Sequence, residues 1–200
     1  MFAFERSTII PASLYDPAIK DEYFMLNHKL SEEYIVSNNK LNDPDSYIIF
    51  DVRKDIFDLV CKRFPEASLS HQVRPLIHSA FIQMTGSDKR YIQVNIEDTY
   101  FNLFIINKGK LEFFNSFKFR NNADILYYLL NSFNRFDIGI DEPVYLSGKI
   151  LKFDDLYNQL LKYIKTLKFT EPEGAFSMSY VFDALGTHQY LNLFNIVTCA

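Results

Sequence analysis

The chain of 200 residues has 21 lysines and arginines against 25 acidic residues, which gives a formal net charge of −4. It contains no basic block, which tells against nucleic-acid binding, because proteins that bind nucleic acids normally carry a basic stripe. Hydrophobic residues make up 48% of the chain. Burial can therefore offset chain entropy, and we expect one sizeable core or two small lobes.

Cysteine usage and hydropathy indicate a cytoplasmic protein. The two cysteines, Cys61 and Cys199, cannot form a disulfide framework or a metal-binding spacing, and a reducing compartment fits them best. No apolar run approaches the ~18 residues that span a bilayer, and the first residues lack the apolar stretch of a signal peptide. We therefore expect a cytoplasmic location without direct membrane insertion.

The first half of the chain alternates short strands with helices. Asp16 and Pro17 supply an N-cap and a first-turn proline. The apolar run at 47–51 is typical of a strand buried on both faces. In chain order we expect a strand opening the stretch 7–15, a helix at 18–28, a strand at 34–36, a turn-rich loop at 38–46, a strand at 47–51, a helix at 54–64, a short strand at Leu69 and a helix at 72–84.

The second half begins with a three-strand meander at 91–120. In its first strand, apolar residues alternate with Gln93, Asn95 and Glu97, which predicts one wet face. Residues 107–110 predict a hairpin turn with Gly109 at positive φ. Beyond the meander we expect a helix at 123–133, a strand at 143–147, a helix capped by Asp154 or Asp155 and ending at 165, a short strand at 168–169, and weaker pieces at 182–185 and 190–194.

This order of elements predicts an α/β fold. Strands separated by helices favour parallel pairing. A meander followed by helix, strand and helix favours a mixed five-stranded sheet with helices on both faces, which is the ribonuclease-H-like or actin-like topology. We expect residues 1–86 to form a partial first lobe with a crossover helix. Residues 87–200 would form a ribonuclease-H-like second lobe with a C-terminal tail.

Five stretches resemble an uncharacterised bacterial family of unknown function with a degenerate actin-like ATPase fold. They are TIIPASLYD, KRFPEASLSHQVRPLIH, FKFRNNADILYYLL, VYLSGKI and FDALGTHQYLNLFNIVTC, and they cover nearly all of the chain. The order of residues 94–130 and 144–150 is also distantly similar to the actin-like cytoplasmic proteins of pilus assembly and type II secretion. None of the stretches is a catalytic motif, so the resemblance implies a lineage and a fold.

The resemblance also implies a β-hairpin that precedes the first crossover and carries the first phosphate loop. Only residues 1–4 come before the strand that includes Ser7. We therefore expect an incomplete first lobe without its N-terminal hairpin, which is either shortened or lost.

A second phosphate loop of the form Asp-x-Gly is implied at residues 95–97. An aspartate there would hold the Mg²⁺ shell or orient water, and a glycine would let backbone N–H groups approach the phosphate. This chain has Asn95 and Glu97 instead, so the anionic ligand is missing and a new negative charge is present. If the degenerate cleft binds ATP with magnesium, the resemblance assigns the contacts to Asn95, Glu97, Asp98, Ser147 and Gly148.

Two further glycine pairs of related folds are altered. Residues 120–122 read Arg-Asn-Asn, and at the end of the strand at 143–147 only Gly148 remains of the second pair. These changes point in the same direction as those at 95–97, so we expect no bound cofactor.

The other site patterns are weak. His71 and His78 lie seven residues apart, which is wider than the i, i+4 spacing of helical metal sites. A nuclease of the ribonuclease H type needs three or four converging carboxylates, and Glu97 and Asp98 are the only acids near a suitable strand. Ser147 lacks the flanking glycines of a nucleophile elbow.

We therefore expect a non-catalytic protein-interaction or scaffold module that docks to a protein partner or to itself. The alternative is a nucleotide-binding switch resembling the pilus-assembly ATPases. The aromatic residues of the meander leave two possibilities open, an exposed face that marks a partner surface or a face covered by a missing lobe or by the helix at 124–134. The first strand, at an edge left open by the missing hairpin, could pair with a second copy.

Overall fold

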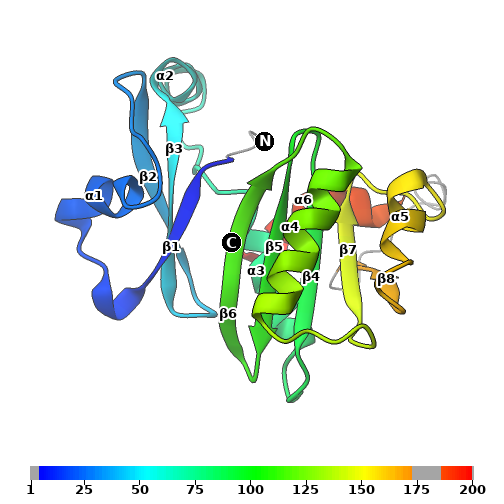
Figure 1. Cartoon of the computed structure of the whole chain (residues 1–200). Helices are drawn as coiled ribbons and strands as arrows, with labels where there is room; N and C mark the ends of the chain where they lie inside the picture. The colour runs from blue at the N-terminus through cyan, green and yellow to red at the C-terminus, as the bar shows by residue number, and fades with distance from the viewer. Residues whose placement is uncertain (1–4, 173–185, 200) are drawn as a thin grey trace. The chain divides into compact units, whose positions relative to one another are not determined.

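Figure 1 shows the computed structural model of the protein, which describes residues 5–172 and 186–199. The chain divides into two compact units, Met1–Arg74 and Pro75–Ala200. Each unit has a sheet of its own. The piece predicted at 182–185 lies outside the described residues.

The first unit is built on a three-stranded antiparallel sheet of order β1-β3-β2. Its elements are β1 (Ser7–Pro11), α1 (Lys20–Met25), β2 (Tyr34–Leu41), β3 (Ser46–Arg53) and α2 (Lys54–Arg63), with short 3-10 helices at Ala12–Leu14 and Pro17–Ile19. The Asp16 carboxylate accepts a hydrogen bond from the Ala18 N–H at 2.9 Å, which confirms the predicted N-cap.

Three details of the first unit differ from the sequence predictions. Parallel pairing is wrong here: β1, which lies on the other side of helix α1 in the sequence, pairs antiparallel with β3, and β2 and β3 form an antiparallel hairpin because residues 42–45 are too few for a parallel crossover. The predicted loop at 38–46 is too long, since its first four residues belong to β2. Leu69 lies in no strand, and its carbonyl accepts a hydrogen bond from Asn39 Nδ2 at 2.8 Å.

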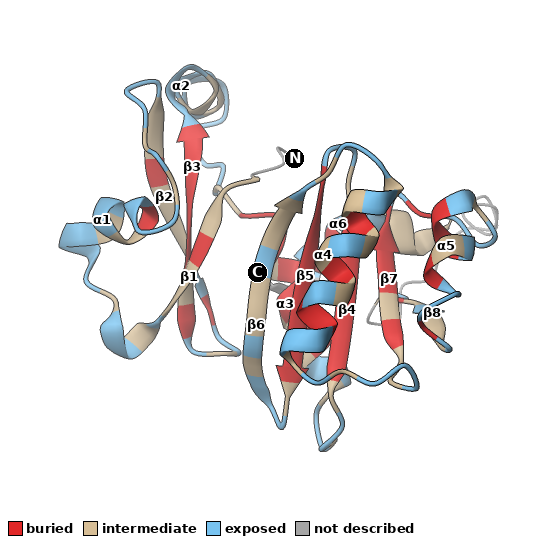
Figure 2. Cartoon of the chain, in the orientation of Figure 1, coloured by how far each residue is buried: buried red, intermediate tan, exposed pale blue. Residues whose placement is uncertain are grey.

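The central strand β3 is buried along most of its length, as its apolar run predicts (Figure 2). Ile49 packs with Phe24 and Val36 in one cluster, and Phe50 packs with Val52 in another. Because neighbouring side chains of a strand point to opposite faces, the two clusters lie on opposite faces of the sheet.

The Arg6 guanidinium joins several parts of the first unit. It pairs with the buried Asp51 carboxylate of β3 and donates to the Lys29 carbonyl at 3.0 Å. It also lies 4.7 Å from the centroid of the Tyr34 ring. Burial raises the pKa of the Asp51 carboxyl, and Arg6 acts against that shift.

The second unit contains a mixed five-stranded sheet of order β6-β5-β4-β7-β8, as predicted. Strands β4, β5 and β6 form an antiparallel meander, whereas β4, β7 and β8 are parallel. The elements are α3 (Arg74–Gln83), β4 (Tyr91–Ile96), β5 (Tyr100–Asn107), β6 (Lys110–Lys118), α4 (Asn122–Arg135), β7 (Val144–Gly148), α5 (Asp155–Leu160), β8 (Leu167–Phe169) and α6 (Leu191–Asn195), with 3-10 helices at Thr187–Tyr190 and Ile196–Cys199.

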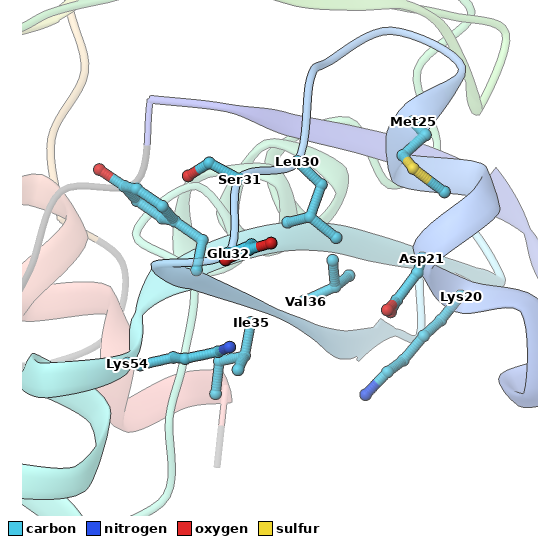
Figure 3. A pocket seen from close by; sticks show the side chains of 10 residues that line it. Lys20, Asp21, Met25, Leu30, Ser31, Glu32, Ile35, Val36 and Lys54 are labelled. Carbon is cyan, nitrogen blue, oxygen red and sulfur yellow. The ribbon is translucent and has the colours of Figure 1, made fainter.

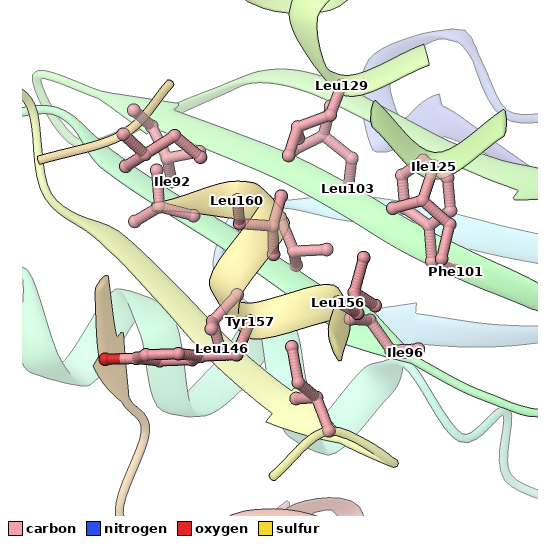
Figure 4. Packing of buried hydrophobic residues seen from close by; sticks show 14 of the residues in the cluster. Ile92, Ile96, Phe101, Leu103, Ile125, Leu129, Leu146, Leu156, Tyr157 and Leu160 are labelled. Atoms are coloured by element: carbon pink, nitrogen blue, oxygen red, sulfur yellow. The ribbon is translucent and has the colours of Figure 1, made fainter. Parts of the chain in front are cut away.

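Helices cover both faces of the five-stranded sheet (Figure 1). Ile125 and Leu129 of α4 and Leu160 of α5 pack on one face (Figure 4). Leu76 of α3 and Leu191 of α6 pack on the other face. As a result, β4 and all but the last residue of β5 are buried (Figure 2).

The prediction of a wet face on β4 is wrong. Gln93 is 1% and Asn95 is 2% exposed, because α3 and α6 cover the face on which these side chains lie. The aromatic rings of β6 are partly covered. Phe113 and Phe117 are partly buried on the α4 side and Phe114 is partly buried on the α3 side, so neither of the two possibilities for the aromatic meander holds in full.

Local signals in the second unit are mostly confirmed. Gly109 of the β5–β6 turn has a φ of +70°. Helix α4 begins one residue before the predicted start and ends two residues beyond the predicted end. Helix α5 ends at Leu160, short of the predicted residue 165.

Truncation of a buried side chain of α4 tests the packing of this helix on the five-stranded sheet. We expect Leu129→Ala to lower the free energy of unfolding by about 2–5 kcal/mol, because the buried side chain leaves a cavity under α4. The control Tyr127→Ala, on the same helix and 66% exposed, should change it by less than about 0.5 kcal/mol. Urea unfolding followed by circular dichroism measures both, and equal effects would contradict the assignment of faces.

Candidate functional site

The sequence-predicted site residues meet where β4 and β7 end. The two strands are adjacent and parallel, with Asn95 opposite Ser147 and Ile96 opposite Gly148. Parallel strands end at the same edge of a sheet, and in open α/β sheets ligands bind outside such carboxyl ends. Residues about 50 positions apart in the sequence therefore share one edge.

A chain of hydrogen bonds runs along these two strands and ends on Glu97. In order, Tyr91 OH donates to Gln93 Oε1 at 3.1 Å, Gln93 Nε2 to Ser147 Oγ at 2.9 Å, Ser147 Oγ to Asn95 Oδ1 at 2.9 Å, and Asn95 Nδ2 to Glu97 Oε1 at 3.0 Å. Every bond donates in the same direction, so each polarises the next toward the carboxylate. The Asn95 amide is thereby engaged on both its oxygen and its nitrogen.

The polar layer extends across the sheet. Asn102 of β5 lies opposite Asn95 and also opposite Ser116 of β6, and Ser116 Oγ donates to Asn102 Oδ1 at 2.6 Å. Four polar side chains in register, from β6 to β7, thus form a belt on the face covered by α3 and α6. A buried polar group must be hydrogen-bonded to avoid a large desolvation penalty, and most of this belt meets that need internally.

Glu97 and its neighbours set the electrostatics of the edge. Burial raises the pKa of the Glu97 carboxyl; the hydrogen bond from Asn95 and the nearby Lys149 act against that shift, and Asp98 adds to it. Lys149 Nζ pairs with Asp98 Oδ2 at 2.5 Å on the exposed side of the edge. That hydrogen bond raises the pKa of Lys149.

Gly148 is required by strand packing. Its φ is +80°, and a Cβ placed on it would lie 2.1 Å from the Ile96 carbonyl oxygen. No side chain fits at that distance, and the oxygen belongs to the backbone, which cannot move aside as a flexible side chain would. The Lys149 N–H donates to the same Ile96 carbonyl, so the close approach is part of the β4–β7 contact.

The N-terminus of α4 is already capped. Asn121 Oδ1 accepts from the Ala123 N–H at 2.9 Å and the Asp124 N–H at 3.2 Å. The Asp124 carboxylate accepts from the Arg120 N–H at 2.8 Å. Helix N-termini attract anions through their free N–H groups and dipole, and here the chain's own side chains take those groups.

The remaining sequence candidates have structural roles. His71 is fully buried and its Nδ1 accepts from the Val73 N–H at 3.2 Å. Asp154 caps α5 by accepting from the Tyr157 N–H at 2.7 Å, which decides between Asp154 and Asp155, the two predicted caps. Within residues 5–172 and 186–199, no group of three His, Cys, Asp or Glu side chains could hold a metal ion.

Sequence reasoning missed the two residues that begin the chain of hydrogen bonds, Tyr91 and Gln93. Gln93 was interpreted as solvent-facing because it alternates with apolar residues. A glutamine and an asparagine two residues apart on a strand, opposite a serine of another strand, can satisfy one another when buried. Such a buried network can be recognised in the sequence only when the partner strand is known.

The fold is that of actin-like ATPases. The structure is similar to that of a Bacteroides thetaiotaomicron protein with actin-like ATPase fold and unknown function, with a TM-score of 0.84 and 23% identity, over 99% of this chain and 72% of that one. It is also similar to a chain of the PilM–PilN type IV pilus biogenesis complex, with a TM-score of 0.61 and 12% identity, over 98% of this chain and 76% of that one.

The chain belongs to the family described as "Protein of unknown function (DUF3822)", whose model matches residues 1–167. A comparison with curated proteins gives no match. Among the described residues, no helix is both long and apolar enough to cross a membrane.

Substitution of Gly148 tests whether close packing against β4, in addition to its positive φ, requires glycine at this position. We expect Gly148→Ala to destabilise the protein by about 3 kcal/mol, because positive φ and the clash with Ile96 add together. Gly109→Ala is the matched control, since Gly109 has a similar φ of +70° and open space around it; it should cost about 1 kcal/mol. Thermal and urea unfolding measure the pair, and equal losses would contradict the packing argument.

The pH dependence of stability tests the burial of Glu97. A raised pKa in the folded state means that the native protein binds the proton more tightly than the unfolded chain. Stability is therefore lost as pH rises from the ordinary value of 4.5 through the folded pKa. As pH rises through this range, we expect the free energy of unfolding of Glu97→Gln to increase relative to that of the wild type. Urea unfolding at a series of pH values measures the difference.

The exposed Glu171 provides the control for this experiment. The free energy of unfolding of Glu171→Gln should differ from that of the wild type by a constant amount across the same pH range. A Glu97→Gln difference that falls as pH rises would show that the carboxylate is better stabilised in the folded protein than in the unfolded chain.

Proposed function

We propose that this protein is a non-catalytic interaction module that uses an actin-like ATPase fold to present surfaces to a protein partner. The observation that carries the proposal is the pairing of Asn95 with a partly buried Glu97 at the position where the resemblance expects Asp-x-Gly. The edge of the sheet is occupied by the chain's own hydrogen bonds.

The charge at this edge supports the absence of nucleotide chemistry. Two unit negative charges ~4 Å apart at an effective dielectric constant near 20 repel by about 4 kcal/mol. An ionised Glu97 facing a triphosphate would therefore weaken binding by about a thousandfold. Asn95, engaged by Ser147 and Glu97, offers no carboxylate to a magnesium ion.

Two other positions support the same proposal. Gly148 has a structural reason to be glycine that involves no ligand, so its presence is no argument for phosphate binding. The α4 N-terminus is capped by Asn121, and the Asp155 carboxylate also lies there, accepting from Asn122 Nδ2 at 2.9 Å. An incoming phosphate would have to displace a cap and approach like charge.

Because the edge of the sheet opposes nucleotide binding, protein docking is the function that we assign to this fold. A structure with the same fold was solved as a PilM–PilN complex, and we extend protein partnering from that case to this chain. The partner is a protein or a second copy of the chain, and the setting is the cytoplasm.

Calorimetric titration with Mg-ATP tests the proposed function. We expect no saturable heat, or a dissociation constant weaker than ~1 mM, because an ionised Glu97 opposes the polyanion. The double variant Asn95→Asp/Glu97→Gly should bind more tightly than the wild type, since it removes that charge and restores a ligand for magnesium. A wild-type dissociation constant below ~100 μM would overturn the proposal and favour the nucleotide-binding switch.

A further inference from the structure

Strand β2 of the first unit has an open edge. It is the last strand of the order β1-β3-β2, and in the described chain it pairs with β3 alone. Open edges are ready templates for another strand, and natural proteins usually protect them with proline, charge or a covering segment. The protected edge of this sheet is β1, which ends in Pro11.

The register shows which backbone groups face outward. The Glu33 carbonyl accepts from the Lys54 N–H at 2.9 Å, so residue 33 faces β3. In an antiparallel ladder both polar groups of a residue point to one side, and the side alternates along the strand. Val36 and Asn38 therefore direct N–H and C=O away from β3, and so does Tyr34, whose N–H bonds back to the Ser31 carbonyl at 3.0 Å.

A pocket of about 450 Å³ lies beside the outward-facing groups of Val36 (Figure 3). Its apolar lining includes Met25 from α1, Leu30 from the following loop, and Ile35 and Val36 from β2. Ile35 and Val36 belong to opposite faces of the sheet, so the pocket reaches around the edge of the strand. A volume of a few hundred Å³ accommodates one or two side chains.

The charges around the pocket balance. Lys20 and Asp21 lie together at the α1 end, and Lys54 lies at the other end beside Ile35 (Figure 3). Glu32 completes the charged lining, and none of these four side chains forms an ion pair within the described residues. A lining of two cations and two carboxylates has no preference for a polyanion, and its mixed ends suit the charged side chains of a peptide.

We propose that the β2 edge and this pocket bind an extended segment of a partner protein by strand addition. The segment pairs with the N–H and C=O groups of Asn38. It places one apolar side chain on Met25, Leu30 and Val36. Main-chain bonds supply affinity and the pocket supplies specificity, as in other cases of β-augmentation. The inference rests on the proposed docking function and names its partner class.

Hydrogen exchange of the full-length protein tests the open edge without any ligand. In ¹⁵N-labelled protein we expect the amide of Asn38 to exchange fast, and those of Ile35 and Ser37 to be protected by β3. Protection of Asn38 in the free protein would mean that its own chain covers the edge, and this would overturn the proposal.

Selection of peptides from a phage-displayed random library supplies the probe. We expect the immobilised full-length protein to enrich peptides with an apolar residue between polar ones. A synthetic copy of an enriched peptide should slow amide exchange at Asn38. Failure to enrich any peptide over the unselected library would overturn the proposal.

Two variants and a matched control locate the binding site of that peptide. Asn38→Pro removes an outward N–H without touching the β2–β3 bonds, and an edge strand tolerates such a proline. Met25→Asp places a charge in the pocket at a side chain that is already 51% exposed. Each should weaken peptide binding at least ~10-fold by fluorescence polarisation, whereas Leu26→Asp, at the next residue, which does not line the pocket, should not.

The outcomes separate the two proposals. Enriched peptides that bind Asn38→Pro and Met25→Asp as well as the wild type overturn the β2 site and leave the non-catalytic function standing. Tight Mg-ATP binding overturns the non-catalytic function and says nothing about β2. If Asn38→Pro fails to fold by circular dichroism, the comparison of Met25→Asp with Leu26→Asp decides.

Discussion

The one-directional chain of hydrogen bonds from Tyr91 to Glu97 is the constraint on which the second unit depends. It allows a row of amides and a hydroxyl to lie under α3 and α6 without the desolvation penalty of unpaired polar groups. It also holds β4 against β7 by side chains as well as by the backbone ladder. The same bonds that permit burial also engage the groups a ligand would need.

An acceptor at the end of this chain is a physical requirement. Each hydrogen bond in the chain polarises the next one. The last donor is the Asn95 side-chain N–H, and it needs an acceptor near the end of β4. Glu97 provides one at the cost of partial desolvation, which is why its pKa is raised. Glycine at this position would leave the Asn95 amide without that acceptor, so Asn95 and Glu97 form a matched pair.

The two units differ at the edges of their sheets. In the second unit the ends of β4 and β7 and the start of α4 are occupied by bonds within the chain. In the first unit the outward groups of β2 lie beside a pocket whose four charged side chains form no ion pair with the residues that the structure describes. Recognition of another molecule requires groups that remain available, and the outward groups of Asn38 on β2 meet this requirement.

The sequence alone was enough for most of the order of elements, the meander, the cap at Asp16, a cap at Asp154 or Asp155, and the mixed five-stranded sheet, because each depends on local spacing or on turn residues. It could not decide the pairing in the first unit, which depends on a tight connection at 42–45. Nor could it reveal that Gln93 and Asn95 are buried, since their partner Ser147 lies about 50 residues away. Burial, hydrogen-bond partners and the open edge of β2 are properties of neighbours in space, and only the tertiary structure decided them.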